Sequence, residues 1–144
     1  MATYQKIEQF TEDLAHKVHN LGSDSLEVTL TNAANPILVT NSVLADLTPI
    51  AYTNLSARGL TTSTSGRASG TYDLVLNDIT LTASGGAVAG FRYIGVFNQT
   101  SSTPTDALIC FFDYGSDLVL ADGESLTIDF ESDGPTTGSL FTLV

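Results

Sequence analysis

The strongest strand signals of the sequence lie in residues 90–130, which read GFRYIGVFNQ (90–99), TSSTPTDALI (100–109), CFFDYGSDLV (110–119) and LADGESLTID (120–129), closed by Phe130. Two apolar runs, Phe91–Asn98 and Ala107–Tyr114, flank a polar loop of Thr, Ser, Pro and Asp. Short runs of apolar, β-branched and aromatic residues bounded by turn residues predict β-strands. Residues 107–112 are apolar at every position, so we expect both faces of that strand to be covered, in a two-layer structure or at a subunit contact.

The second half of the stretch holds two further runs, Asp117–Ala121 and Ser125–Phe130, on either side of Asp122-Gly123. Asp-Gly between two such runs is a strong hairpin signal, so we predict a hairpin here. In Ser125–Phe130 the apolar side chains alternate with polar ones, which indicates a strand with one dry face and one wet face.

Outside this stretch the chain offers more short strands. The predicted strands are Leu26–Thr31, Ile37–Thr40 as a short edge strand, Tyr72–Asn77, Ile79–Ala83 and Gly138–Val144, with a single helical turn at Ser42–Leu47. Residues 52–70 are rich in Thr, Ser and Gly and read as a long, partly extended loop, with a weak strand at Leu60–Ser63. A loop of this length in a compact domain is usually functional, and Arg58 and Arg67 are its only charges.

The N-terminal region predicts one amphipathic helix, Tyr4–Asn20, with Thr3 as its N-cap. Its apolar stripe consists of Ile7, Phe10, Leu14, Val18 and Leu21. The stripe can pack on the chain's own sheet, or the helix can be an arm that docks on another subunit. Either way it needs a packing surface, because an isolated helix of this length is marginal in water.

Together these patterns predict a mainly β protein of 144 residues: an N-terminal helical segment, residues 1–22, and a single β-sandwich domain of jelly-roll type, residues 23–144. The formal net charge is −11, and residues 71–144 carry one Lys or Arg against ten Asp or Glu. A surface this acidic repels phosphate backbones, so nucleic acid is not an expected partner. The chain begins without an apolar signal region and lacks a run of about 20 apolar residues, so we expect no membrane partner.

Catalytic and metal chemistry have weak sequence support. His16 and His19 fall on the polar side of the predicted helix and are expected at the surface, without a base–nucleophile pair or a third ligand. The carboxylates of Asp113, Asp117, Asp122 and Glu124 could bind calcium, but their spacing does not match an EF-hand loop. The lone Cys110 is expected to be a buried, inert thiol. We therefore expect no enzyme activity, no cofactor and no metal.

Several phrases resemble a known group of proteins. KIEQFTEDLAHKVHNLGSDSLEVTLTN (6–32), TYDLVLNDITLTASGG (71–86), GFRYIGVFN (90–98) and ALICFFDYGSDLVLADGESLTIDF (107–130), with a short Leu/Thr tail, are similar to small tailed-bacteriophage virion proteins. The resemblance covers most of the chain and implies a head decoration (cement) protein. Such a protein is made in the host bacterial cytoplasm, assembles as a homotrimer and binds the major capsid protein on the outside of the capsid.

The resemblance brings no active-site residues with it. Our candidate residues for capsid or subunit contacts are the five apolar residues of the predicted helix stripe together with Arg58 and Arg67. Two other functions stay open: a tail or collar component of the virion, and a carbohydrate-binding module that attaches particles to cells. In the last case Tyr52, Tyr72, Tyr93 and Tyr114 are candidate stacking residues.

Overall fold

The computed structural model describes residues 2–130 and 139–144. These residues form antiparallel sheets and one short α-helix, so the prediction of a mainly β protein is confirmed. The strands are β1 (Thr3–Lys6), β2 (Leu26–Thr31), β3 (Thr62–Ala68), β4 (Thr71–Leu76), β5 (Ile79–Thr82), β6 (Phe91–Ser102), β7 (Thr105–Leu118), β8 (Ser125–Ile128) and β9 (Phe141–Leu143). The helix is α1 (Glu8–Ala15), and η1 (Leu44–Asp46) is a single 3₁₀ turn.

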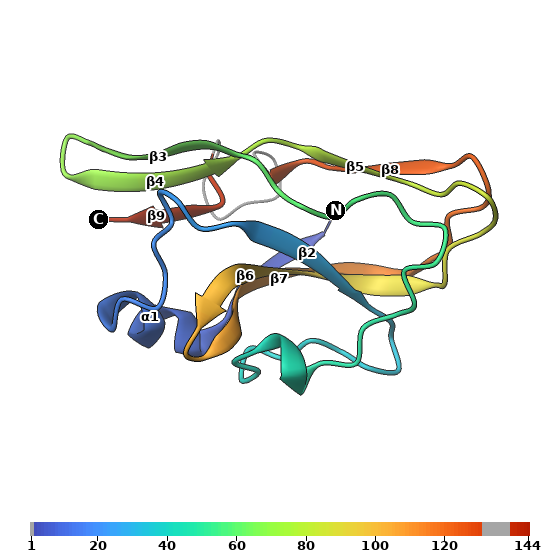
Figure 1. Ribbon diagram of the computed structural model, residues 1–144, viewed down its shortest axis with the longest axis horizontal. Coiled ribbons are helices and arrows are strands. Elements are labelled where there is room, and N and C mark those ends of the chain that lie inside the picture. Colours follow the sequence, from blue (N-terminus) through green and yellow to red (C-terminus); the bar gives the residue numbers. More distant parts are fainter. Residues whose placement is uncertain (1, 131–138) are drawn as a thin grey trace.

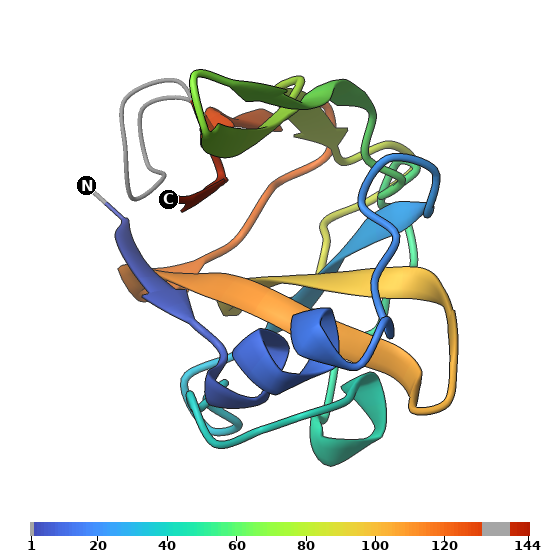
Figure 2. The same cartoon turned by 90° about the vertical axis from the view of Figure 1, so that its left-hand side faces the viewer.

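The strands lie in two layers (Figure 1). One layer is the four-stranded sheet β1-β7-β6-β2. The other contains the three-stranded sheet β3-β4-β9 and the pair β5-β8. Helix α1 lies at the same end of the molecule as β9 (Figure 1), and in the view of Figure 2 it lies in front of β7; Phe10 of the helix contacts Phe141 of β9.

The hairpin β6–β7 is the centre of the fold, as its apolar runs predict. All six residues of 107–112 are buried, so the expectation that both faces of this strand are covered is confirmed. On one face, Phe112 packs against Phe130 with 6.0 Å between the ring centroids. On the other, Phe111 packs against Tyr93 at 6.3 Å.

Gly95 lies opposite both Thr29 and Phe111 in this sheet, where the side chain of Ile37 comes close to the backbone. A Cβ at this position would lie 2.7 Å from Thr29 Cγ2 and 3.0 Å from Ile37 Cδ1. Glycine therefore lets the 36–40 segment close over the outer face of the sheet.

The predicted helix Tyr4–Asn20 is wrong at both ends. Residues 3–6 form β1, which pairs with β7 in the register Thr3↔Asp113 to Lys6↔Cys110. The exposed edge of β7 offers these residues a ladder of backbone hydrogen bonds, which outweighs helix propensity. Thr3 is accordingly not the N-cap, a position that Ile7 occupies. The helix ends near Ala15, and Lys17 then takes a left-handed conformation with φ 64°.

The predicted hairpin across Asp122-Gly123 is also wrong. The runs 107–114 and 117–121 are not separate strands, because β7 continues through to Leu118. After the turn, β8 pairs with β5 and not with β7. Residues 37–40 form no strand, and the weak strand expected at 60–63 is instead β3, which forms a hairpin with β4.

The remaining strand predictions are confirmed to within a few residues. The single helical turn predicted at 42–47 is η1. The C-terminal run pairs with β4 through Tyr72↔Leu143, Asp73↔Thr142 and Leu74↔Phe141. The start of that predicted strand, Gly138, lies outside the described residues.

Candidate interaction groove

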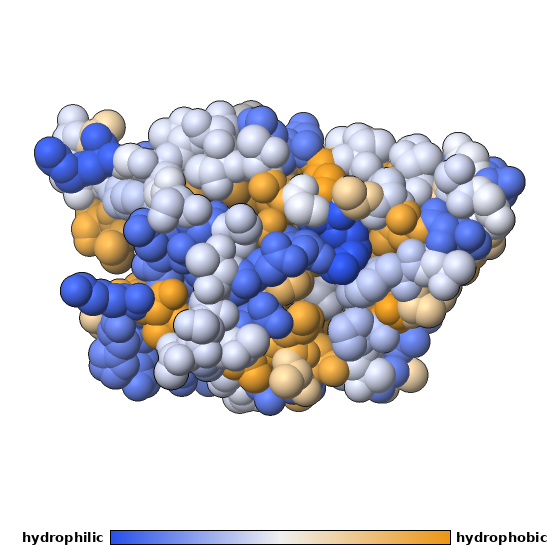
Figure 3. All heavy atoms as spheres, in the orientation of Figure 1, coloured by the Kyte–Doolittle hydropathy of each residue, from blue (hydrophilic) through white to orange (hydrophobic). Residues whose placement is uncertain are grey.

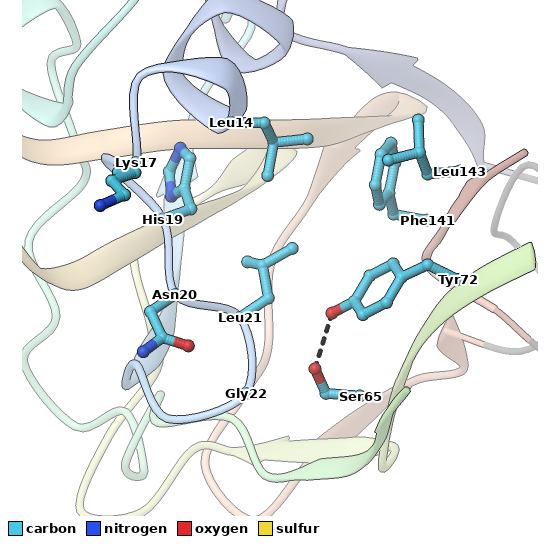
Figure 4. Close-up of a pocket in the computed structure, with 10 residues that line it drawn as sticks. All are labelled: Leu14, Lys17, His19, Asn20, Leu21, Gly22, Ser65, Tyr72, Phe141 and Leu143. Atoms are coloured by element: carbon cyan, nitrogen blue, oxygen red, sulfur yellow. Dashed lines mark hydrogen bonds between the residues drawn. The ribbon is translucent and has the colours of Figure 1, made fainter. Parts of the chain in front are cut away.

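A groove of about 760 Å³ lies between the end of α1 and the sheet β3-β4-β9. It is lined by Leu14, Lys17, His19, Asn20, Leu21, Gly22, Ser65, Tyr72, Phe141 and Leu143. Figure 4 shows Leu14 and Leu21 facing Tyr72 and Phe141 across the opening, while Lys17 and Asn20 point outward at its side. In Figure 3 the same end of the molecule has hydrophobic surface exposed between its two layers.

The sheet wall of the groove is ordered by strand register. Arg67, Tyr72 and Leu143 lie directly opposite one another on β3, β4 and β9, so their side chains share one face of the sheet. Tyr72 is fixed by a 2.6 Å hydrogen bond between its hydroxyl and that of Ser65. Leu143 is 55% exposed, although large apolar side chains are usually buried.

The groove also differs in charge from the rest of the protein. The chain has 16 Asp and Glu, and none of those within residues 2–130 and 139–144 lines the groove. Lys17 lines the groove, and Arg67 lies in the same cross-strand row as two lining residues. This surface is therefore apolar with basic groups beside it, on a strongly acidic protein.

The residues of the predicted helix stripe are placed by the fold as follows. Ile7, Phe10 and Leu21 are buried in the common core, whereas Leu14 and Val18 are partly buried. In this structure the helix therefore packs on its own chain. Of the five, Leu14 and Leu21 line the groove.

The two candidate arginines have different environments. Arg58 is held within the chain: it pairs with Glu27 at 2.6 Å, donates a hydrogen bond to the carbonyl of Val28, and stacks on Tyr52 with 3.7 Å between its guanidinium carbon and the ring centroid. Arg67 is exposed on β3, and no ion pair of this residue is seen among the described residues. Arg67 is therefore the arginine that is accessible to a partner.

A buried polar cluster supports the loop wall of the groove. The expected surface position of His19 is wrong, because this ring is 8% exposed and packs edge-on against Phe10 at 5.1 Å. The side-chain amide of Asn98 donates to His19 Nδ1 at 3.0 Å and to Asp24 Oδ2 at 2.6 Å. Burial lowers the pKa of His19 from its ordinary value of 6.5, and the nearby Asp13 and Asp24 oppose that shift. His16, in contrast, is exposed as expected.

The four carboxylates considered for calcium each accept hydrogen bonds from a different part of the chain. Asp113 accepts two hydrogen bonds from Arg92, at 2.7 and 2.9 Å, which hold its pKa below the ordinary value. The others accept backbone N–H groups: Asp117 from Ala33, Asp122 from Gly85 and Glu124 from Ala121. Within the described ranges, no three His, Cys, Asp or Glu side chains are grouped as a metal site.

Cys110 and two of the candidate stacking tyrosines make contacts within the chain's own structure. Cys110 is fully buried, and this burial raises the pKa of its thiol. Tyr52 hydrogen-bonds Thr29 and the backbone of Leu30, while Tyr93 packs on Phe111. Tyr114 is the most exposed candidate for stacking, at 40%. Among residues 2–130 and 139–144, no helix has the length and apolar character needed to cross a membrane.

Comparisons with known proteins give no assignment. A scan against protein-family models finds no matching family, and searches of curated proteins and of solved structures find no match.

Proposed function

We propose that this protein is a non-enzymatic structural protein of a tailed-bacteriophage virion, a head decoration (cement) protein with a jelly-roll-like β-sandwich. It binds the major capsid protein on the outside of the shell as a homotrimer and stabilises the shell by bridging neighbouring capsid subunits. The sequence resemblance motivates this proposal. The observation that carries it is the groove, where exposed Leu143 and Arg67 share one face of the sheet β3-β4-β9.

The properties of the groove suit a contact with another protein. Apolar surface beside polar residues is typical of protein interaction sites, and Arg and Tyr are among the residues that contribute most to such interfaces. A partner segment that is apolar and carries carboxylates would bury Leu143 and pair with Lys17 and Arg67. The acidic remainder of the surface would disfavour other orientations through repulsion.

Multivalent attachment explains how such a contact would stabilise a shell. A trimer presents the groove three times, so one bound subunit raises the effective concentration of the other two at their sites. Separating adjacent capsid subunits then requires several contacts to break together. Moderate affinity at each groove is sufficient for this mechanism.

The proposal is tested by adding the purified protein to expanded heads that lack it and measuring the bound protein after sedimentation. Saturable binding is expected, with a copy number per particle near one per shell subunit or a simple fraction of it. A handful of copies would instead indicate a tail or collar component. If the protein is absent from purified particles and does not bind to the added heads, the virion proposal is wrong.

The role of the groove is tested with two variants. Leu143→Asp and Arg67→Glu are each expected to weaken binding to heads by about tenfold or more, since the loss of one well-packed contact in an interface commonly exceeds about 1.4 kcal/mol. The control is Val119→Asp, which places a new charge on another exposed apolar residue, one that does not line the groove. If all three variants bind like the wild type, the groove is not the shell contact.

A further inference from the structure

The loop between α1 and β2 contributes half of the residues that line the groove. The side-chain amide of Asn98 holds this loop in position. Lys17, His19, Asn20, Leu21 and Gly22 all line the groove. Asn98 on β6 connects this loop to the β6–β7 hairpin, through its two hydrogen bonds to His19 and Asp24. The loop is otherwise tied to the hairpin near its far end, at Ser25, through Thr100 and Gln99.

The orientation of the Asn98 amide is fixed by its neighbours. Its Oδ1 accepts the backbone N–H groups of Thr100 at 2.9 Å and Ser101 at 3.2 Å. Its amino group must therefore point toward Asp24 and His19. Rotating the amide would set its carbonyl against the Asp24 carboxylate and its amino group against two N–H donors, so the amide cannot adapt to its partners.

The orientation of the Asn98 amide determines which ring nitrogen of His19 carries the proton. Because Asn98 donates to Nδ1, that nitrogen must be an unprotonated acceptor, and the neutral ring carries its proton on Nε2. Nε2 is buried and has no hydrogen-bond partner among the described residues, and the same is true of Asp13 Oδ2. A second proton, on Nδ1, would place two donors against each other at 3.0 Å.

We propose that His19 is a pH-sensitive latch: protonation of its ring breaks the hydrogen bond with Asn98 and releases residues 16–22, one wall of the groove, from the β6–β7 hairpin, while Asp24 and Ser25 keep their own bonds to it. An effect of this latch on shell binding rests on the proposed function. The latch itself is a property of the free protein and can be measured without a shell. Once released, the charged ring can pair with Asp13, whose buried carboxylate oxygen then gains a donor.

The groups that face His19 act in opposite directions. Asp13 on α1 and Asp24 in the loop favour the charged ring, whereas Lys17 at the end of α1 is a like charge on the same groove. Asn98 on β6 and Phe141 on β9 have no ionisable group, and the hydroxyl of Tyr72 on β4 is hydrogen-bonded to Ser65. Burial is the largest influence, and it favours the neutral ring.

The sign of the pH dependence follows from this balance. In the unfolded chain His19 takes up a proton as the pH falls through its ordinary pKa of 6.5, while in the folded chain it remains neutral to a lower pH. Below pH 6.5 the unfolded state therefore binds more protons, and falling pH favours it. One such group raises the unfolding constant by up to about tenfold per pH unit, until the folded ring also titrates.

The chain has two histidines, which provides a matched pair of variants. Unfolding in urea is measured between pH 7.5 and pH 5 for the wild type, His19→Gln and His16→Gln. The unfolding constant of the wild type should rise more steeply with acid than that of His19→Gln, by up to about tenfold per pH unit. His16→Gln, which removes an exposed ring, should keep the wild-type profile. Equal profiles for the wild type and His19→Gln would overturn the proposal.

A second measurement applies even if His19→Gln does not fold. In His16→Gln the remaining imidazole NMR signals belong to His19, and their midpoint in the folded protein should lie below 6.5; a midpoint at or above this value contradicts the latch. Hydrogen exchange, corrected for intrinsic rates, should show that acid lowers protection in residues 16–22 more than in β6 and β7. A uniform loss would mean global destabilisation and no latch. No heads are used, so this outcome is separate from the test of the proposed function.

Discussion

Replacing Phe10 with alanine is expected to lower the free energy of unfolding by about 3–5 kcal/mol, the usual cost of removing a buried aromatic ring. Phe10 is fully buried, and its ring meets His19 at 5.1 Å and Phe141 at 5.0 Å, both edge-on. It thus joins α1, the following loop and β9. A domain of this size has only about 5–15 kcal/mol of stability in total, so the variant should be close to unfolding at 37 °C.

The measurement is urea unfolding of Phe10→Ala at several protein concentrations, followed by circular dichroism. Glu12→Ala, on the exposed side of the same helix, is the control and should stay within about 0.5 kcal/mol of the wild type. The result also decides how the helix packs. If α1 were an arm on another subunit, Phe10→Ala would weaken the oligomer and leave the unfolding of the single chain nearly unchanged.

Replacing Arg58 with alanine is expected to lower the free energy of unfolding by about 2–4 kcal/mol. This is less than the loss of one partner from a fully buried ion pair, because the Arg58 side chain keeps some contact with solvent. Three contacts are lost together: the ion pair with Glu27, the hydrogen bond to the Val28 carbonyl and the stacking on Tyr52. The first leaves the Glu27 carboxylate, whose side chain is 14% exposed, without its cation. The segment at 58–60, which hydrogen-bonds along β2, loses its anchor.

Arg67→Ala is the matched control, since it removes the same side chain from an exposed site and should change stability by less than about 0.5 kcal/mol. Arg58→Lys keeps the charge and loses the planar stacking, so an intermediate loss is expected. A double-mutant cycle with Glu27→Gln isolates the ion pair. A coupling energy near zero, with a wild-type midpoint for Arg58→Ala, would show that Arg58 is free to serve as a contact residue after all.

The parts of the fold that the sequence predicts well are those with strong local periodicity. The apolar runs around 91–98 and 107–114 form the central hairpin, and the alternation in 125–130 corresponds to β8. Strand β3 is missed because TSTSGRA has no apolar alternation, and its pairing with β4 supplies the structure. The Ser69-Gly70 turn, in which both residues have positive φ, is the available signal.

The groove can be predicted only in part. Leu14, Leu21 and Arg67 follow from helical periodicity and loop composition. Tyr72, Phe141 and Leu143 cannot be placed beside them, because β4 and β9 lie about 70 residues apart and pairing at that range has no local signature. The burial of His19 is missed for a geometric reason. Helical phase is lost when the helix ends near Ala15, and the left-handed Lys17 then redirects the chain inward.

Strand β1 has a consequence for the order in which the chain folds. Its partner residues on β7 are synthesised more than 100 residues later. Strand β2 likewise has no partner until β6 has been synthesised. Of the pairings in the four-stranded sheet, only β6–β7 closes a short loop, so this hairpin is the least costly nucleus in chain entropy. Until β7 leaves the ribosome, the N-terminal segment has no edge to join. A chain truncated before residue 110 should therefore expose Ile7 and Phe10 and require a chaperone to stay in solution.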